Sequence, residues 1–401
     1  MDRRQRISLG TAPWALLVGV LSLGGCSLLA NLDGYRFEDK TSGGGGGSPG
    51  VGSGASQGQG QVSAGGSVGC IADLLTDSEN CGKCGWSCLG AACADGECQI
   101  DLLAGFASGG MFGDIALDDE RVYWTSDGGI LELSKQTPDA GPMKVFEEPT
   151  GADFIVVDAA SIYFSSFELG GVGRISKSTF EASLLASNES NPGGLALFGG
   201  MLYWTIYANS GSVRSIKTES SSDSMPVTVE SAQHYPFMVA ADASGVYWTF
   251  QDASAGGVKK AGAELPIVEK QALPSGLALD EVNAYWINGD ASVFMAPKAG
   301  GGPITQLGST EGEIFYGEVA VDETHVYWTG AGRDVCIGKS CAECGDPCGK
   351  VYRAKKDGNG VREVFAEGNW GSLFGLAMDA TAVYFTTGED GRLFRKVKPA
   401  K

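Results

Sequence analysis

Histidine is almost absent from this sequence of 401 residues, which contains only His234 and His325. Serine and cysteine hydrolases usually need a positioned base beside the nucleophile, and that base is most often histidine. His325 falls in a turn before an aromatic segment and His234 in the loop segment AQHYP, and nothing around His234 matches a nucleophile motif. We therefore predict no catalytic residues of the triad type.

Positive charge is also scarce, with 29 Lys and Arg against 48 Asp and Glu and a formal net charge of −19. Such a surface repels a phosphate backbone, so nucleic acid is not an expected partner. Charged residues make up only 19% of the chain, whereas glycine occurs 62 times. Little charge with much glycine favours many short strands and turns over long solvated helices.

No long apolar run is present either, because the apolar stretch near the N-terminus is shorter than the roughly 20 residues of a membrane-spanning helix. The segment reads MDRRQRISLGTAPWALLVGVLSLGGC, with a basic start, an apolar run and small residues. That order is typical of an export signal.

The end of this segment, Leu23-Gly24-Gly25-Cys26, resembles the lipobox of bacterial lipoproteins. The resemblance implies a signal peptide over residues 1–25, cleavage before Cys26 and lipidation of that cysteine. Ser27 replaces the aspartate of the inner-membrane retention signal, so we expect an exported protein at the outer membrane or cell surface. The lipid would be its only contact with the membrane. A plain signal peptide with an incidental cysteine is the alternative.

Two short regions follow before the bulk of the chain. Residues 26–69 hold the lipidated cysteine and a Gly/Ser-rich stretch, which predicts a disordered, flexible linker. Residues 70–98 hold six cysteines: Cys70, Cys81, Cys84, Cys88, Cys93 and Cys98. An even number in a small exported segment predicts three disulfides of unreadable connectivity. The Cys81-x-x-Cys84 spacing keeps zinc as the alternative.

From residue 99 onward one phrase recurs. The copies are IALDDERVYWTS (115–126), IVVDAASIYFSS (155–166), LALFGGMLYWTI (195–206), VAADASGVYWTF (239–250), LALDEVNAYWIN (277–288), VAVDETHVYWTG (319–330) and LAMDATAVYFTT (376–387). Successive tyrosines lie 40, 40, 44, 38, 42 and 57 residues apart. A period near 40 with several short strands per copy is typical of propeller blades.

Each copy divides into a short apolar strand, a turn that usually holds aspartate, and an aromatic strand. We assign the aspartate to the turn, because its carboxylate can accept backbone N–H bonds two residues on. Both faces of the aromatic strand are bulky, which predicts burial between two neighbouring blades. Third strands ending in Lys or Arg, such as GVGRISK, are expected to point these side chains into solvent.

The seventh copy ends after its third strand. Residues 101–118 align with residues 362–379, so we expect a strand at about 99–106 to complete the last blade. Closure removes exposed strand edges. The prediction is an all-β chain: a seven-bladed β-propeller of four-stranded antiparallel blades over residues 99–401, after the disulfide-rich module and the disordered linker.

The VYWT segments, with GLALD upstream, resemble the YWTD propellers of extracellular receptors and, more loosely, NHL-type propellers. The aspartate of the YWTD motif is replaced in every copy, so the polar network of that family is not implied. YWTD propellers have six blades, whereas seven copies occur here.

Calcium-dependent propeller lactonases are a second resemblance, and they place carboxylates around the central channel. The equivalent positions, four residues before each turn aspartate, hold only two carboxylates, Asp114 and Glu318. A hard cation usually takes six to eight oxygens. We expect no cofactor, with a calcium site at Asp114 and Glu318 as the alternative.

Long loops that share one face of the propeller carry the candidate binding residues Tyr235, Phe315, Tyr316, Trp370 and Phe374. The same face receives an insert with four further cysteines, expected as two disulfides with zinc as the alternative: Cys336, Cys341, Cys344 and Cys348. Aromatic loops on a rigid scaffold are typical of binding surfaces, and plugging of the channel mouth is the other interpretation.

The sequence thus predicts a lipid-anchored, monomeric protein of the cell envelope that binds a protein or glycan without catalysis. The alternative is a hydrolase or lactonase that uses a divalent cation in the central channel.

Overall fold

The structure is a computed structural model. It describes residues 73–105, 113–126, 129–147, 151–221, 224–252, 255–309, 317–331, 349–359, 361–370, 373–387 and 391–399. The chain divides into two compact units, Met1–Ser67 and Val68–Lys401, and every described residue belongs to the second. Several predicted features lie outside the described residues: the signal peptide, Cys26, the linker, Cys70, Phe315, Tyr316, Cys336, Cys341, Cys344 and Cys348.

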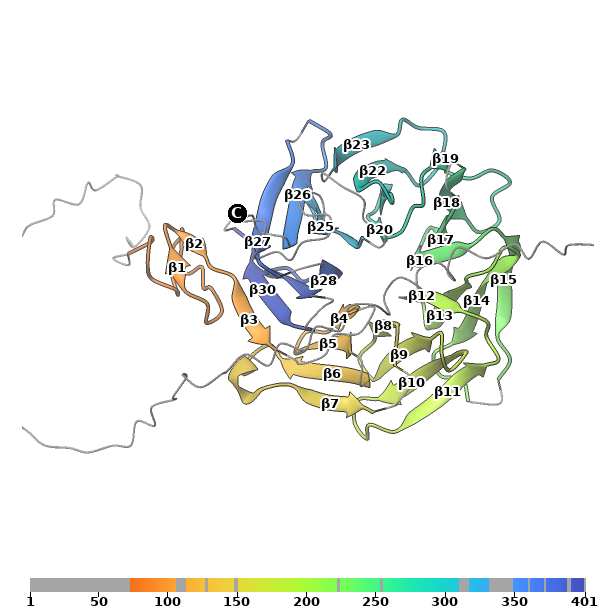
Figure 1. Cartoon of the computed structure of the whole chain (residues 1–401), viewed down its shortest axis with the longest axis horizontal. Coiled ribbons are helices and arrows are strands. Elements are labelled where there is room, and N and C mark those ends of the chain that lie inside the picture. The colour runs from red at the N-terminus through yellow and green to blue at the C-terminus, as the bar shows by residue number, and fades with distance from the viewer. Residues whose placement is uncertain are drawn as a thin grey trace, which may run out of the picture. The chain divides into compact units, whose positions relative to one another are not determined.

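Seven four-stranded antiparallel sheets surround a common axis as the blades of a propeller (Figure 1). This confirms the predicted fold. The first three blades are β4(Ile115–Leu117), β5(Arg121–Ser126), β6(Gly129–Ser134), β7(Met143–Phe146); β8(Phe154–Val157), β9(Ser161–Ser166), β10(Gly171–Ser176), β11(Ala182–Ser187); and β12(Pro192–Phe198), β13(Met201–Ile206), β14(Gly211–Lys217), β15(Val227–Gln233).

The next three blades are β16(Pro236–Asp242), β17(Gly245–Phe250), β18(Gly256–Lys260), β19(Val268–Gln271); β20(Leu277–Leu279), β21(Asn283–Ile287), β22(Ser292–Pro297), β23(Thr305–Ser309); and β24(Val319–Val321), β25(His325–Ala331), β26(Gly349–Lys355), β27(Glu363–Gly368). Within each of these six sheets the strands are adjacent in chain order, so each of these blades is a meander.

The last blade joins the two ends of the propeller. It contains β28(Leu373–Met378), β29(Ala382–Thr387), β30(Leu393–Val397) and, as its fourth strand, β3(Asp101–Ala104). β3 pairs antiparallel with β30, with Leu102 opposite Phe394. A strand from the start of the propeller thus occupies an edge of β30 that would otherwise be unpaired.

Aromatic side chains pack between all seven pairs of neighbouring blades. The tyrosine of each aromatic strand shares a hydrophobic cluster with the Trp or Phe that follows the corresponding tyrosine in the next blade. The seven pairs are Tyr123 with Phe164, Tyr163 with Trp204, Tyr203 with Trp248, Tyr247 with Trp286, Tyr285 with Trp328, Tyr327 with Phe385, and Tyr384 with Trp124. Within one aromatic strand, the period-2 alternation sends the tyrosine to one face of the blade and the following Trp or Phe to the other face. The motif is therefore packing between blades.

The turn aspartates do more than close a turn. Asp118 accepts backbone N–H bonds from Glu120 and Arg121 through Oδ1, and through Oδ2 it accepts the hydroxyl of Tyr123 at 2.9 Å and the ammonium of Lys177 at 2.7 Å. Lys177 belongs to the next blade and lies 4.8 Å from the centroid of the Tyr123 ring.

The same ion pair recurs at five blade boundaries. The pairs are Lys177 with Asp118, Lys298 with Asp242, Lys356 with Asp280, Lys398 with Asp322 and Lys135 with Asp379. We call Lys135, Lys177, Lys298, Lys356 and Lys398 the inter-blade lysines.

The expectation that lysines at the ends of third strands are solvated is wrong for this set. Lys298 and Lys398 expose only 6% and 9% of their side chains, because each bridges to the aspartate of the preceding blade. A cation can be buried there because a carboxylate and a tyrosine ring both face its ammonium.

The third blade departs from this pattern. Phe198 replaces the turn aspartate, so the boundary with the fourth blade has no acceptor of this kind. At the boundary with the second blade, Thr218 occupies the lysine position, since its backbone N–H donates to Gly200 just as that of Lys177 donates to Ala160. Both boundaries of the third blade are therefore held without the recurring ion pair.

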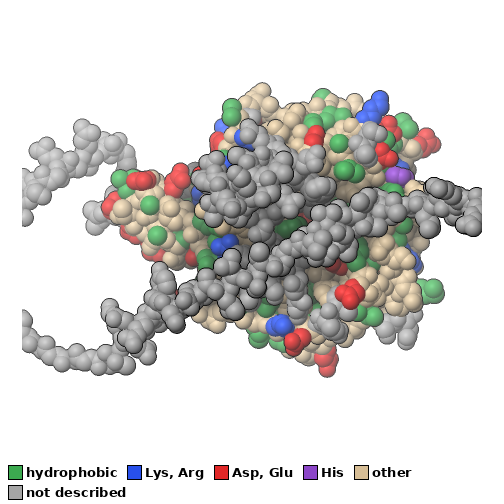
Figure 2. All heavy atoms as spheres, viewed as in Figure 1, with side chains coloured by type: hydrophobic (Ala, Val, Ile, Leu, Met, Phe, Trp, Pro, Cys, Tyr) green, Lys and Arg blue, Asp and Glu red, His purple; other side chains and the backbone are tan. Residues whose placement is uncertain are grey.

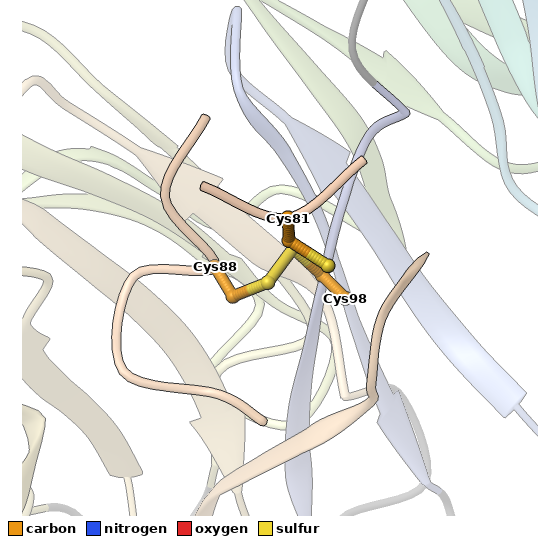
Figure 3. Close-up of side chains that lie close together, drawn as sticks. All are labelled: Cys81, Cys88 and Cys98. Atoms are coloured by element: carbon orange, nitrogen blue, oxygen red, sulfur yellow. A yellow bond between two sulfur atoms is a disulfide. The ribbon is translucent and has the colours of Figure 1, made fainter. Parts of the chain in front are cut away.

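The cysteine-rich module consists of loops and a short hairpin, β1(Cys93–Ala94) and β2(Glu97–Cys98). Disulfides join Cys81 to Cys93 and Cys88 to Cys98, and Cys84 is also disulfide-bonded. The sulfurs of Cys81, Cys88 and Cys98 lie within 4.8 Å of one another, and Figure 3 shows these three side chains gathered together. Bonded sulfur is not a thiolate, so these cysteines do not provide the ligands that zinc needs.

The module is docked on the last blade. The Trp86 indole donates to the carbonyl of Lys398 at 3.2 Å, and Val397 packs into the cluster around the disulfides. Arg395, 1% exposed, donates to the carbonyl of Leu89 and to Asp101.

The described residues contain one helical element, the 3₁₀ turn η1(Pro138–Ala140), and none of their helices could cross a bilayer. Acidic side chains are scattered over the described part of the face seen in Figure 2, on the module and on several blades, rather than gathered in one patch.

Candidate functional site

Asp114 and Glu318 meet at the propeller axis. Each stands immediately before an inner strand, β4 and β24, and each donates its backbone N–H to a threonine of the following aromatic strand, at 3.0 Å to Thr125 and 3.1 Å to Thr329. The two side chains line one cavity, although the last blade lies between the first blade, which holds Asp114, and the sixth, which holds Glu318. The last blade contributes Gly375 to the lining, and a Cβ at this position would clash with the carbonyl of Gly113 in the first blade.

Three phenylalanines close the rest of this cavity: Phe154, Phe237 and Phe374. The volume of this cavity is about 20 Å³. That is enough for one water molecule but far below the roughly 300 Å³ of a small-molecule site. Among the described residues, aromatic rings therefore fill the axis at this level, and Phe374 is the one member of the predicted loop aromatics that lines it.

The surrounding protein desolvates both carboxyls, although part of each still faces the cavity. Burial raises the pKa of Asp114, against the two backbone N–H bonds that it accepts at 2.8 Å from Ile115 and Ile155. Burial also raises the pKa of Glu318 well above its usual value, and the negative charge of Asp114 adds to the effect. Two like charges in a small dry space disfavour double ionisation.

These carboxyls are poor calcium ligands. Both oxygens of Asp114 already accept N–H bonds, and Glu318 adds one more carboxylate. Calcium usually binds six to eight oxygens, so the described residues at this point of the channel supply too few.

A chain of aromatic rings leads from the plugged axis to the surface. Phe154 contacts Phe237 at 6.0 Å between centroids, Phe237 contacts Tyr207 at 5.8 Å, and Tyr207 contacts Tyr235 at 5.1 Å. His234 packs edge-on against Tyr235 at 4.9 Å and is exposed. We call Phe154, Phe237, Tyr207, Tyr235 and His234 the aromatic array.

The outer part of the array is held by Gln251. Its side-chain oxygen accepts the Tyr207 hydroxyl at 3.0 Å, and its backbone oxygen lies 3.2 Å from Nδ1 of His234. Its backbone N–H donates to the carbonyl of Tyr235. The two half-buried tyrosines and the histidine therefore form a fixed surface.

A carboxyl lies beside the inner end of the array. Asp153, next to Phe154 in the chain, accepts the N–H of Phe167 at 2.6 Å, and Phe167 packs edge-on against Phe154. Burial raises the pKa of Asp153 to about 6, with a further contribution from the charge of Glu168.

The predicted binding residues are thus separated by the structure. Tyr235 is in the array and half-buried, and Phe374 lines the axial cavity. Trp370 differs from the expectation: it is 9% exposed and packs on Phe385 and Phe394 at 5.0 and 4.9 Å, so it belongs to the core of the last blade. Sequence reasoning missed Tyr207, which directly follows the aromatic strand MLYWTI and could have been found as the aromatic residue extending that motif.

No protein-family model matches the sequence, and none of the curated proteins matches it either. Solved structures do resemble the fold. A streptogramin B lyase structure is 12% identical, covers 75% of this chain and 98% of its own, and has a TM-score of 0.58.

A catalytically inactive virginiamycin B lyase from Staphylococcus aureus, with quinupristin, is 14% identical over 75% of this chain and 98% of its own, with a TM-score of 0.56. A chain of the mitotic checkpoint complex is 9% identical over 75% and 91%, with a TM-score of 0.57. At these identities the likeness establishes the β-propeller fold and leaves function to the site.

Proposed function

We propose that this chain is a lipid-anchored protein of the cell envelope whose propeller binds a protein or glycan without catalysing a reaction. The observation that carries the proposal is the combination of aromatic rings that fill the axis beside Asp114 and Glu318 with an aromatic surface next to them. The cavity of about 20 Å³ beside Asp114 and Glu318 cannot admit a substrate. Tyr207, Tyr235 and His234 instead present rings at the surface.

The chemistry of this surface suits either kind of ligand. Flat rings stack against the apolar faces of sugars, and tyrosine is enriched in protein interfaces because it is apolar with a polar tip. The surface is built on loops that a closed scaffold holds in place, as in many binding proteins.

A test compares two aromatic residues with positive φ on opposite faces of the propeller, the half-buried Tyr235 and the exposed Phe180. Tyr235 has φ +39° and leads into an inner strand, whereas Phe180 has φ +57° and lies in the turn between a third and a fourth strand. Purified unit 68–401 and its Tyr235→Ala and Phe180→Ala variants are applied to arrays of envelope glycans and to photo-crosslinking with surface proteins. We expect Tyr235→Ala to bind the captured ligand at least tenfold more weakly than the unaltered protein, and Phe180→Ala to bind it equally well. Equal binding by both variants would contradict this location.

The segment that contains the four further cysteines, residues 332–348, is tested on the same arrays with a variant in which this segment is shortened. The anchor is tested separately: Cys26→Ser in the full chain should move the protein from the membrane to the soluble fraction. Retention of that variant in the membrane would contradict lipidation at this residue.

A second candidate is a divalent-cation-dependent hydrolase, favoured by one observation, the desolvated pair of Asp114 and Glu318. Clustered carboxyls with raised pKa values are typical of functional sites. Calorimetric titration with Ca²⁺ separates the two proposals. If the chain is a binding scaffold, titration with Ca²⁺ should give no heat that depends on Glu318. If it is the hydrolase, Ca²⁺ should bind, and Glu318→Gln should abolish this binding.

A further inference from the structure

A second cavity, away from the aromatic array, lies between the cysteine-rich module and the last two blades. It encloses about 280 Å³. On the module side its walls include Cys81, Cys98 and Trp86, and the two cysteines are labelled in Figure 3. On the propeller side they include β26, β27 and β30.

The propeller wall is rich in cations although the chain as a whole carries a net charge of −19. Arg353, Lys396 and Lys398 all line the cavity. Arg353 is paired with Glu363 at 2.7 Å, and Lys398 with Asp322 at 3.2 Å. Two of the three cations are therefore neutralised by direct contacts.

Lys396 is the exception. Among the described residues its ammonium has no hydrogen-bond or ion-pair partner, and its contact is the ring of Phe365, 5.3 Å from the centroid. Burial lowers its pKa, and the charge of Arg353 adds to this effect, while the charges of Glu97 and Glu367 oppose it. A partly desolvated cation that makes no direct ion pair is unfavourable and is stabilised by an anion that contacts it.

The remaining walls are apolar. Phe365 and Val397 are buried, and Trp86, Val364 and Pro399 complete the lining. The indole N–H of Trp86 is already used in its bond to the Lys398 carbonyl, so that ring offers its apolar faces. Small-molecule sites commonly combine such walls with a few polar groups.

We propose that this cavity binds a small organic anion, a carboxylate attached to an apolar or aromatic body, with Lys396 as the counter-ion. The carboxylate of the ligand forms an ion pair with the ammonium of Lys396, and the apolar part of the ligand lies between Trp86 and Phe365. The site is independent of the surface proposed above, and its closure depends on the docking of the disulfide module.

Benzoate serves as the probe and benzamide as its uncharged counterpart, with binding to the purified chain followed by calorimetry. We expect benzoate to bind at least tenfold more tightly than benzamide. Lys396→Met should weaken benzoate binding at least tenfold. Lys144→Met, which removes a surface lysine of the first blade, should leave it unchanged.

Glu97→Gln should change the affinity for benzoate in the opposite direction. Glu97 is an exposed carboxylate at the cavity wall, so removing its charge should strengthen benzoate binding about two- to fivefold by reducing like-charge repulsion. A variant that merely disturbs the fold cannot tighten binding.

A measurement on the unaltered chain completes the test. Benzoate should slow acetylation of Lys396 in peptide mapping, and benzamide should not. Equal binding of benzoate and benzamide, or benzoate binding that Lys396→Met does not change, overturns the proposal. Inorganic phosphate that binds as tightly as benzoate through Lys396 overturns the apolar part of the site.

Discussion

The ammonium of Lys356 in the sixth blade lies 2.7 Å from Oδ2 of Asp280 in the fifth. The same oxygen accepts the hydroxyl of Tyr285 at 2.7 Å, so one carboxylate connects the turn, the aromatic strand and the next blade. Both charged side chains are 19% exposed, which places the pair between a surface salt bridge and a buried one. Its contribution to stability should therefore be measurable.

We expect the double-mutant cycle of Lys356→Met and Asp280→Asn to give a coupling free energy of about 1–2 kcal/mol, within the usual range for contacting residues. Lys356→Met alone should cost more than the double variant, because it leaves the Asp280 charge without its partner. Urea denaturation measures both. The control is Lys144→Met, which breaks an exposed pair with Glu147 and should change stability by less than about 0.5 kcal/mol. If the effects of the two single substitutions on the free energy of unfolding are additive, the ion pair does not contribute to stability.

Acid should weaken the ring through the same aspartates. Burial alone would raise their pKa values, but lysine and backbone N–H donors outweigh it and lower the pKa of Asp280, Asp322 and Asp379 to about 2. A folded-state pKa below the ordinary value of 3.8 stabilises the fold above that pH, and this stability is lost as the pH falls toward 2. The free energy of unfolding should therefore decline steeply from about pH 5 to pH 2. Denaturation curves across this range measure it. Asp280→Asn should flatten the decline, and an unchanged slope would contradict the assignment.

Thr218 offers a gain of stability. It occupies the inter-blade lysine position at the boundary where Asp158 already accepts the Tyr163 hydroxyl. Thr218→Lys should supply the absent cation and raise the free energy of unfolding by about 0.5–1 kcal/mol, as for a partly exposed ion pair. Thr218→Met controls for the longer side chain. Equal stability of the Lys and Met variants would show that no ion pair forms.

Glu318 should destabilise the fold at high pH. Its folded-state pKa is raised by burial and by Asp114, so the stability it contributes is present below its ordinary pKa and is lost as the pH rises through the folded-state value. Glu318→Gln should therefore raise the free energy of unfolding at pH 8, because it removes the buried negative charge. At pH 4 the substitution should have little effect. Thermal denaturation at both pH values measures the difference, and a gain of the same size at both would contradict the titration and point to packing.

The repeat could be predicted from sequence because its signal is local. Each VYWT-like strand alternates bulky residues to both faces, and only a strand sandwiched between two blades buries both. Seven such copies, with the first strand aligning with the end of the last, are sufficient to specify a closed seven-bladed ring.

The inter-blade lysines escaped sequence reasoning, since a lysine at the end of a strand is usually solvated. Its partner lies in the preceding blade, about 60 residues away in the case of Lys177 and Asp118. The lysine recurs one residue after most third strands, and this was the available signal. Trp370 was misassigned for a related reason: an aromatic residue in a loop has no local sign of which way it points, and packing on Phe385 and Phe394 turned it inward.

The sequence by itself determined the architecture, because blade identity depends on side-chain alternation within a few residues. Only the tertiary structure decided what the candidate site is. Whether Asp114 and Glu318 face an open channel or a plugged one depends on Phe154, Phe237 and Phe374 from other blades. Whether Tyr207 and Tyr235 form one surface depends on loops of the third and fourth blades meeting at Gln251. Such convergence is a property of ring closure, which brings distant segments to one point and which no local pattern records.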